Sequence, residues 1–371
     1  MAYEERKALM QDIENLRGKR TLVCLCNFDR ASKPELPGLS TQFHADMKEC
    51  LYRILKESPA TKGLDLFLYT RGGDTNSVWP IACLLREFDP DFELLVPFRA
   101  HSAGTMLALA ARRTTMTRLA ELSPIDPTTG NQFNPVDPVV QGNRLGISVE
   151  DVRAYQDFLR QSLLMRGSDE ELSEDDRRAL SPFIQKLVDA VHPLALGNVH
   201  RVYQLVSRLA EKLMRLHEIN GRDVEKVVRA LTVETYSHLH MIGREEAIEV
   251  LGCEQVLRAT DGLEAKLDAL LKRYEDDFEL RSPLFGPRLM APTEPAVDSS
   301  FVGGVVESRY WGYVFETKVK ITQHSKLPPG VNVQIPPGQP MPLIPGLPRE
   351  FSLEIHEQGW HRNPTSEGVT L

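Results

Sequence analysis

A serine and a pair of glycines stand at two points where an apolar run gives way to small residues. Ser102 lies in the sequence AHSAGT, between an apolar run and a segment rich in Ala and Leu. A serine at the start of a helix can act as a nucleophile, because the positive end of the helix dipole stabilises its alkoxide. Gly72 and Gly73 follow the preceding apolar run, in TRGGDT. The N–H groups of Gly72, Gly73 and Ala103 are therefore expected to form an oxyanion hole.

Two strand–turn–helix units are expected to position these residues. The runs Leu64–Tyr69 and Phe92–Phe98 have the length and apolar content of buried strands. Helical patterns over 78–88 and 103–111 follow them. Parallel strands of this kind end at the same edge of a sheet, so the glycine turn and Ser102 are predicted to face each other there.

The remaining pattern predicts an α/β protein with a helical insertion. Further strands are expected at 20–26 and 114–116, and helices at 3–18, 41–57, 149–166, 174–191, 196–216, 222–231 and 262–277. From about Pro283 proline becomes frequent, with strand-like YWGYVFETKVKI and FSLEI on either side of the proline-rich part. We therefore predict a main domain over 1–280 and a Pro-rich C-terminal extension with a few β-strands over 281–371.

Composition excludes several classes of function. The chain has 371 residues, 42% of them hydrophobic, and a net charge of −8 without a block of Lys or Arg. Nucleic-acid binding and attachment to an acidic membrane face are not indicated. No uncharged apolar run approaches 18 residues and the N-terminus is polar, so we expect neither a membrane span nor a signal peptide. Five dispersed cysteines without a CxxC pair favour a cytoplasmic protein with no disulfide framework and no zinc site.

Three motifs carry a resemblance to a known family. The segments RGGDT (71–75), HSAGT (101–105) and ELSPIDP (121–127) resemble the serine dehydrogenase proteinase family of the Clp protease/crotonase-like superfamily, which is related to signal peptide peptidase A. The segment 232–252 resembles the later histidine-containing block of this family. The resemblance implies a Clp/crotonase-like spiral of ββα units, Ser102 as nucleophile, a peptide or protein substrate, and a homo-oligomer without a cofactor.

The sequence also departs from the family pattern. Arg71 stands where the family usually has proline, and Arg112 and Arg113 stand where it often has an acidic residue. The Clp proteolytic subunit has its catalytic histidine in a block that corresponds to Pro124–Pro127, where this chain has Ile-Asp-Pro. The general base of Clp therefore has no counterpart here.

His238 is the first candidate for the base, because it lies in SHLHMI, which matches the histidine block of the family. Asp126 is expected to orient its imidazole or to stabilise the protonated ring. His240 projects to the same side of a strand and is the second candidate. A Ser–Lys dyad is disfavoured, because no lysine lies between Ser102 and Lys186. His101 is expected to point away from the serine if the strand continues to that point.

No metal site is expected. His238 and His240 with a nearby glutamate could mimic part of a zinc site, but there is no HExxH motif and no evident third ligand. RGGDT lacks the spacing of a phosphate-binding loop.

The leading functional prediction is a serine peptidase that forms an acyl-enzyme on Ser102. One alternative is a non-catalytic oligomeric scaffold of the same fold. Another is a crotonase-type thioester enzyme, in which the same hole would stabilise an enolate, although nothing marks an adenine-nucleotide pocket. An α/β-hydrolase elbow fits poorly, because Ala100 replaces the first glycine of GxSxG. The extension from Pro283 is expected to cap an oligomer or to recruit a protein partner.

Overall fold

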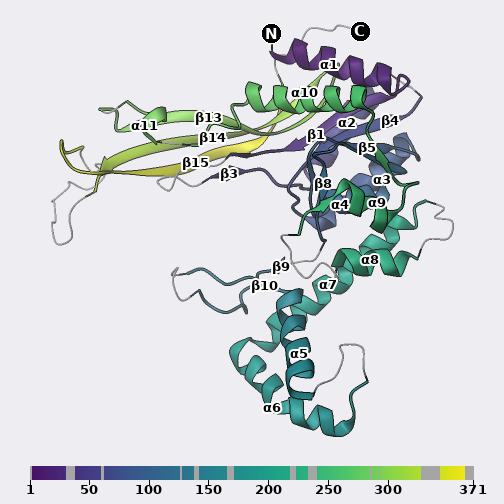
Figure 1. Cartoon of the computed structure of the whole chain (residues 1–371). Coiled ribbons are helices and arrows are strands. Elements are labelled where there is room, and N and C mark those ends of the chain that lie inside the picture. Colours follow the sequence, from purple (N-terminus) through teal and green to yellow (C-terminus); the bar gives the residue numbers. More distant parts are fainter. Residues whose placement is uncertain are drawn as a thin grey trace. The chain divides into compact units, whose positions relative to one another are not determined.

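The computed structural model describes residues 2–30, 38–59, 62–125, 128–137, 142–164, 171–217, 223–232, 240–284, 286–291, 293–326 and 343–363. The chain forms two compact units (Figure 1). The first unit contains 1–121 and 243–371, and the second contains 122–242. The first unit includes residues on both sides of the boundary at 281 that the sequence suggested.

An eight-stranded mixed sheet is the centre of the first unit, with the strand order β12-β7-β5-β4-β1-β13-β14-β15. Neighbouring strands from β12 to β1 are parallel, whereas β13, β14 and β15 join antiparallel. The bounds are β1 Thr21–Asn27, β4 Leu64–Tyr69, β5 Glu93–Val96, β7 Arg113–Met116, β12 Val256–Arg258, β13 Ala296–Ser308, β14 Gly312–Ser325 and β15 Arg349–Arg362. The predicted α/β class is confirmed.

Helices of the first unit follow the parallel strands or pack on the sheet. They are α1 Ala2–Leu16, α2 Met47–Glu57, the 3-10 helix η1 Thr75–Ser77, α3 Val78–Phe88, α4 Ala103–Ala110, α9 Arg244–Leu251, α10 Asp261–Asp277 and α11 Gly286–Leu289. Helices α1 and α10 lie side by side (Figure 1). Their apolar faces pack Met10, Ile13, Leu267 and Tyr274 against the buried thiol of Cys24. Burial raises the pKa of this thiol, so Cys24 is a neutral core residue.

Short strands lie at the turns that leave the sheet. They are β2 Asp29–Arg30, β3 Leu39–Ser40, β6 Arg99–Ala100, β8 Glu121–Leu122 and β11 Ile242–Gly243. Strands β2 and β3 pair antiparallel as a hairpin. Single bridges join Phe43 to Gly73 and Thr70 to Ala100. These bridges fix the segments around the candidate site.

The second unit is mainly helical, as the sequence predicted for the insertion. It contains β9 Thr128–Thr129, β10 Ile147–Ser148, α5 Val149–Leu164, α6 Glu174–Ala190, α7 Pro193–Met214 and α8 Val224–Thr232. The His192 Nδ1 accepts the N–H of Leu194 at 3.1 Å and so caps α7. Its ring also stacks on Phe133. His192 therefore has a structural role: it caps α7 and packs against Phe133.

Two elements differ from the prediction. The helix expected from residue 41 begins at Met47, because the backbone of Phe43 pairs with the glycine turn instead. Strand β13 was not predicted, because Gly303 and Gly304 interrupt its apolar pattern. It nevertheless pairs with β1 from Val23 to Asn27, so residues 296–308 belong to the same sheet as the N-terminal strand.

None of the helices in the described ranges combines the length and the apolar character that crossing a bilayer requires.

Candidate active site around Ser102

Ser102 lies at the sharp turn between β6 and α4. The His101 N–H donates to the Thr70 carbonyl at 3.0 Å, and the Thr70 N–H donates to the Arg99 carbonyl at 2.9 Å. These bonds join the segment before Ser102 to the end of β4. Ser102 itself has φ 47° and ψ −105°, and its side chain is half-buried. A non-glycine residue in this conformation costs about 1–3 kcal/mol, and such strained strand-to-helix turns expose the nucleophile of some hydrolases.

Gly72 lies directly against the serine. A β-carbon added to Gly72 would stand 2.8 Å from Ser102 Cβ and 3.4 Å from Ser102 Oγ. The φ of Gly72 is +99°, which also favours glycine. The glycine turn and the serine, which the sequence predicted to face each other, are therefore in contact.

Gly73 is held from its other side by Phe43. The Phe43 N–H donates to the Gly72 carbonyl at 2.9 Å, and the Asp74 N–H donates to the Phe43 carbonyl at 2.8 Å. A β-carbon on Gly73 would lie 2.4 Å from the Phe43 carbonyl oxygen. In this strand-like pairing the Asp74 N–H points toward Phe43. The Gly73 N–H points to the opposite side of the segment, because successive N–H groups of an extended chain alternate in direction.

The three N–H groups predicted to form the oxyanion hole differ in their hydrogen bonds. The Gly72 N–H donates to Thr70 Oγ1 at 3.1 Å, and Thr70 is fully buried. Within the described ranges, the N–H groups of Gly73 and Ala103 donate no hydrogen bond. Ala103 is the first residue of α4, where backbone N–H groups have no partner inside the helix. The N–H groups of Gly73 and Ala103 are thus not used by the hydrogen bonds of the described residues.

Asp74 stabilises the turn that follows the glycines. Its carboxylate accepts the Ser77 hydroxyl at 2.6 Å and the Asn76 N–H at 3.0 Å. Burial alone would raise the pKa of Asp74, but the hydrogen bonds from Ser77 and Asn76 outweigh it and lower that pKa. A charged Asp74 therefore holds the start of α3 in place.

A histidine–glutamate pair stands beside the nucleophile. His101 Nε2 lies 3.0 Å from Glu121 Oε1, and the Arg99 Nε donates to the same oxygen at 3.1 Å. The His101 residue is 7% exposed, and burial lowers the pKa of its imidazole despite the opposing effect of Glu121. Arg99 and Arg71 lower it further. The imidazole contacts Glu121, and sequence reasoning did not identify this pair.

Arg71, where the family usually has proline, forms an ion pair with Asp29 at 2.7 Å. The Arg71 side chain is 59% exposed in this pair. Arg71 thus links the glycine turn to β2, and its charge acts on the nearby His101.

The predicted base and its partner cannot be placed. His238 and Asp126 lie outside the described residues, so their roles remain predictions. His240, the second candidate, is described in the second unit and is half-buried. No group of three or more metal-ligating side chains occurs in the part of the chain that the structure covers.

Part of this chain matches a known protein family. Residues 2–143 match the model described as "ClpP-like SDH-type serine proteinase". This segment is therefore similar to the ClpP-like SDH-type serine proteinases. The predicted resemblance is confirmed over these residues, and with it the ClpP-like α/β fold. The match includes Gly72, Gly73, Ser102 and the His101–Glu121 pair. The later block, 232–252, lies outside it.

Two curated relatives and two solved structures are similar to this chain. The relatives are uncharacterized proteins of Methanocaldococcus jannaschii, one 28% identical over 130 residues and the other 25% identical over 195 residues. These alignments span 35% and 49% of this chain, and 45% and 66% of the relatives. The chain thus matches less than two thirds of the length of either relative.

One of the solved structures is a mutant of the 1510-N membrane-bound stomatin-specific protease, with a TM-score of 0.36 and 13% identity over 61% of this chain and 79% of that one. The other is an enoyl-CoA hydratase from Bacillus halodurans, with a TM-score of 0.17 and 11% identity over 54% of this chain and 98% of that one.

Proposed function

We propose that this protein is a serine peptidase that cleaves peptide bonds through an acyl-enzyme on Ser102. The observation that carries the proposal is the strained backbone of Ser102, at φ 47° and ψ −105°, in contact with Gly72 inside the segment that matches the SDH-type proteinases. A conformation this costly persists only where the surrounding structure enforces it, and it is typical of functional sites.

In the proposed reaction, Ser102 Oγ attacks the carbonyl carbon of the scissile peptide bond. The carbonyl oxygen becomes an oxyanion, which accepts hydrogen bonds from the N–H groups of Gly73 and Ala103. The N-terminus of α4 adds its positive dipole at the same point. Gly72 permits this approach because it has no β-carbon, and its own N–H keeps its bond to Thr70 Oγ1.

The serine proton passes to a general base and then to the leaving amine, and water hydrolyses the acyl-enzyme. We propose His238 as this base and Asp126 as its partner. The support is the resemblance of 232–252 to the histidine block of the family. We also propose action in the cytosol as a homo-oligomer on peptide or protein substrates, with the C-terminal extension as a possible contact for a partner.

Intact-mass labelling with a fluorophosphonate tests the proposal. One adduct on the wild type, absent in Ser102→Ala and much slower in His238→Ala, is the expected result. Ser300→Ala and His356→Ala serve as controls, because both residues are exposed on strands outside the site. An adduct that persists in Ser102→Ala would assign the reactivity to another residue. No adduct on the wild-type protein would favour the scaffold alternative.

A further inference from the structure

Strands β13, β14 and β15, which we call the C-terminal ribbon, contact the β2–β3 hairpin at a β-bulge in β13. Gly303 is the extra residue of this bulge, because its two neighbours pair with consecutive residues of β14. The Gly303 carbonyl accepts the Phe28 N–H at 2.7 Å, and the Phe28 carbonyl accepts the Thr41 N–H at 3.1 Å. Phe28 precedes β2 and Thr41 follows β3, so the bulge is tied to both ends of the hairpin.

The glycine at position 303 is required by space and not by backbone conformation. Gly303 does not have a positive φ, so other residues could adopt its backbone angles. A β-carbon on Gly303 would lie 2.2 Å from Thr41 Oγ1, and a β-carbon on Gly304 would lie 3.3 Å from Thr41 Cγ2. The two glycines therefore accommodate the Thr41 side chain, and a branched residue at position 303 would displace it.

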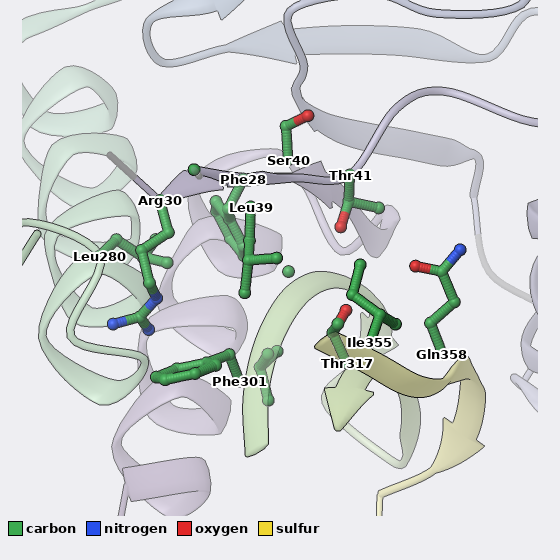
Figure 2. A pocket seen from close by; sticks show the side chains of 13 residues that line it. Phe28, Arg30, Leu39, Ser40, Thr41, Leu280, Phe301, Thr317, Ile355 and Gln358 are labelled. Atoms are coloured by element: carbon green, nitrogen blue, oxygen red, sulfur yellow. The ribbon is translucent and has the colours of Figure 1, made fainter. Parts of the chain in front are cut away.

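Side chains of the hairpin also point toward the ribbon. Leu39 and Thr41 point toward the ribbon strands, and Ser40 between them points away (Figure 2). Leu39 packs against an apolar cluster that β14, β15 and the region of α11 form. A cavity of about 170 Å³, whose described lining includes Arg30 and Thr41, lies beside these contacts (Figure 2). The ribbon therefore holds segment 39–41 through Leu39 and Thr41, with open space next to them.

The same segment continues into the glycine turn beside Ser102. Phe43 follows Thr41 by two residues and is fully buried. Its N–H donates to the Gly72 carbonyl at 2.9 Å, and its carbonyl accepts the Asp74 N–H at 2.8 Å. A displacement of Thr41 therefore has only two residues of chain in which to be absorbed before it reaches the turn.

We propose that the C-terminal ribbon positions the glycine turn through residues 39–43, with Gly303 and Thr41 as positioning residues. While the bulge holds Thr41, Phe43 keeps its two backbone hydrogen bonds and Gly72 stays against Ser102. The expected effect on reactivity rests on the proposed function of Ser102, whereas the coupling between ribbon and turn does not. The Arg71–Asp29 ion pair joins the same parts, but exposed ion pairs of this kind contribute little.

Hydrogen–deuterium exchange of the full chain measures the coupling without any activity. Leu39→Ala is expected to speed amide exchange about tenfold in the peptides that contain Phe43 and Asp74, because the hairpin loses packing against the ribbon. Leu353→Ala is the matched control, since Leu353 packs against the same apolar cluster but belongs to β15. Both variants remove the same side chain from one cluster, so a general loss of packing would affect the glycine turn equally in both.

A second pair of variants tests the bulge itself. Gly303→Val is expected to speed the same exchange and to slow fluorophosphonate labelling of Ser102, each about tenfold. Gly359→Val on β15 is the control, because no atom lies within 4 Å of a β-carbon added there. The double variant Gly303→Val/Thr41→Ala should recover most of both rates, since it frees the space that the valine needs. If Gly303→Val does not fold, Leu39→Ala against Leu353→Ala decides.

Two results would overturn the proposal. One is equal exchange at the glycine turn in Leu39→Ala and Leu353→Ala, because the hairpin would then have no special role. The other is a double variant that recovers neither rate, because the effect of Gly303→Val would then be general destabilisation. A wild-type protein that does not label, but whose exchange responds as expected, would contradict the peptidase function and leave the coupling supported.

Discussion

Gly72 and Ser102 are packed so closely that a β-carbon on the glycine would stand 2.8 Å from Ser102 Cβ. The contact joins two turns that follow neighbouring parallel strands, β4 and β5. We therefore expect the reactivity proposed for Ser102 to depend on the absence of a side chain at position 72.

Gly72→Ala is expected to lower fluorophosphonate labelling about 100-fold, because a displacement near 1 Å at a reacting group has an effect of this size. Chemical denaturation should show a loss of about 1–3 kcal/mol from the strained φ. Gly18→Ala is the control, since Gly18 has φ +73° but no atom within 4 Å of its added β-carbon. It should lose stability without losing labelling. Wild-type labelling of Gly72→Ala would contradict the role of this contact.

Replacing the serine should relieve the strain at its own position. Ser102→Gly is expected to exceed Ser102→Ala in free energy of unfolding by about 1 kcal/mol, because glycine adopts φ 47° without a β-carbon penalty. Neither variant should label. Urea denaturation of both variants measures the difference. Equal stabilities would show that the backbone at this residue is not strained.

The hydrogen bond from Gly72 to Thr70 offers a third test. Thr70→Val leaves the Gly72 N–H without its acceptor, which should reduce stability by about 1–2 kcal/mol and slow labelling about tenfold. Thr105→Val is the matched control, because its buried hydroxyl donates to the Ala100 carbonyl, whereas the Thr70 hydroxyl accepts the Gly72 N–H. If labelling slowed equally in both variants, a general loosening of α4 would explain the lower labelling rate of Ser102, and the hydrogen bond in the glycine turn would not.

Lowering the pH should reduce the free energy of unfolding through protonation of His101. Burial lowers the pKa of its imidazole in the folded state below the unfolded value of roughly 6.5, so the unfolded chain takes up the proton first. The stability linked to a neutral His101 is present above that pH and is lost as the pH falls toward the folded pKa. Glu121, Arg99 and Arg71 are the charged groups that affect this imidazole.

Urea denaturation as a function of pH measures this linkage. The wild type should lose stability below pH of roughly 6.5, and His101→Gln should lose less over the same interval. His324→Gln on β14 is the control, and it should retain the wild-type pH dependence. An identical profile for His101→Gln and the wild type would exclude His101 as the source.

The C-terminal strands are expected to be essential for the stability of the first unit. Glu307 of β13 is fully buried, accepts Arg6 Nε at 2.8 Å, and accepts the Tyr274 hydroxyl at 2.6 Å. Glu307→Gln should reduce the free energy of unfolding by about 1–3 kcal/mol, because it removes one of the two buried carboxylates that compensate the Arg6 guanidinium, the other being Asp277. Glu4→Gln, in an exposed pair with Lys7, should cause little change. A small effect of Glu307→Gln in chemical denaturation would contradict this expectation.

Local sequence patterns predicted most elements of the fold. The bounds of β4 and α3 agree with the prediction, and the helical insertion has the expected segments, because apolar periodicity and turn residues act over a few positions. The same local reasoning predicted that Ser102 and the glycine turn would meet, since parallel strands end at one edge of a sheet. Strand β13 escaped prediction because Gly303 and Gly304 break its pattern.

The sequence by itself predicted Ser102 as the nucleophile, the glycine turn and most of the strands and helices in their order, because each depends on residues close together in the chain. Only the tertiary structure decided that His101 meets Glu121, that Arg71 pairs with Asp29, and that β13 joins β1. It also decided the cavity at Arg30, whose walls come from segments hundreds of residues apart. Such contacts depend on how distant segments pack, and no local pattern records the partner that a buried charge will find.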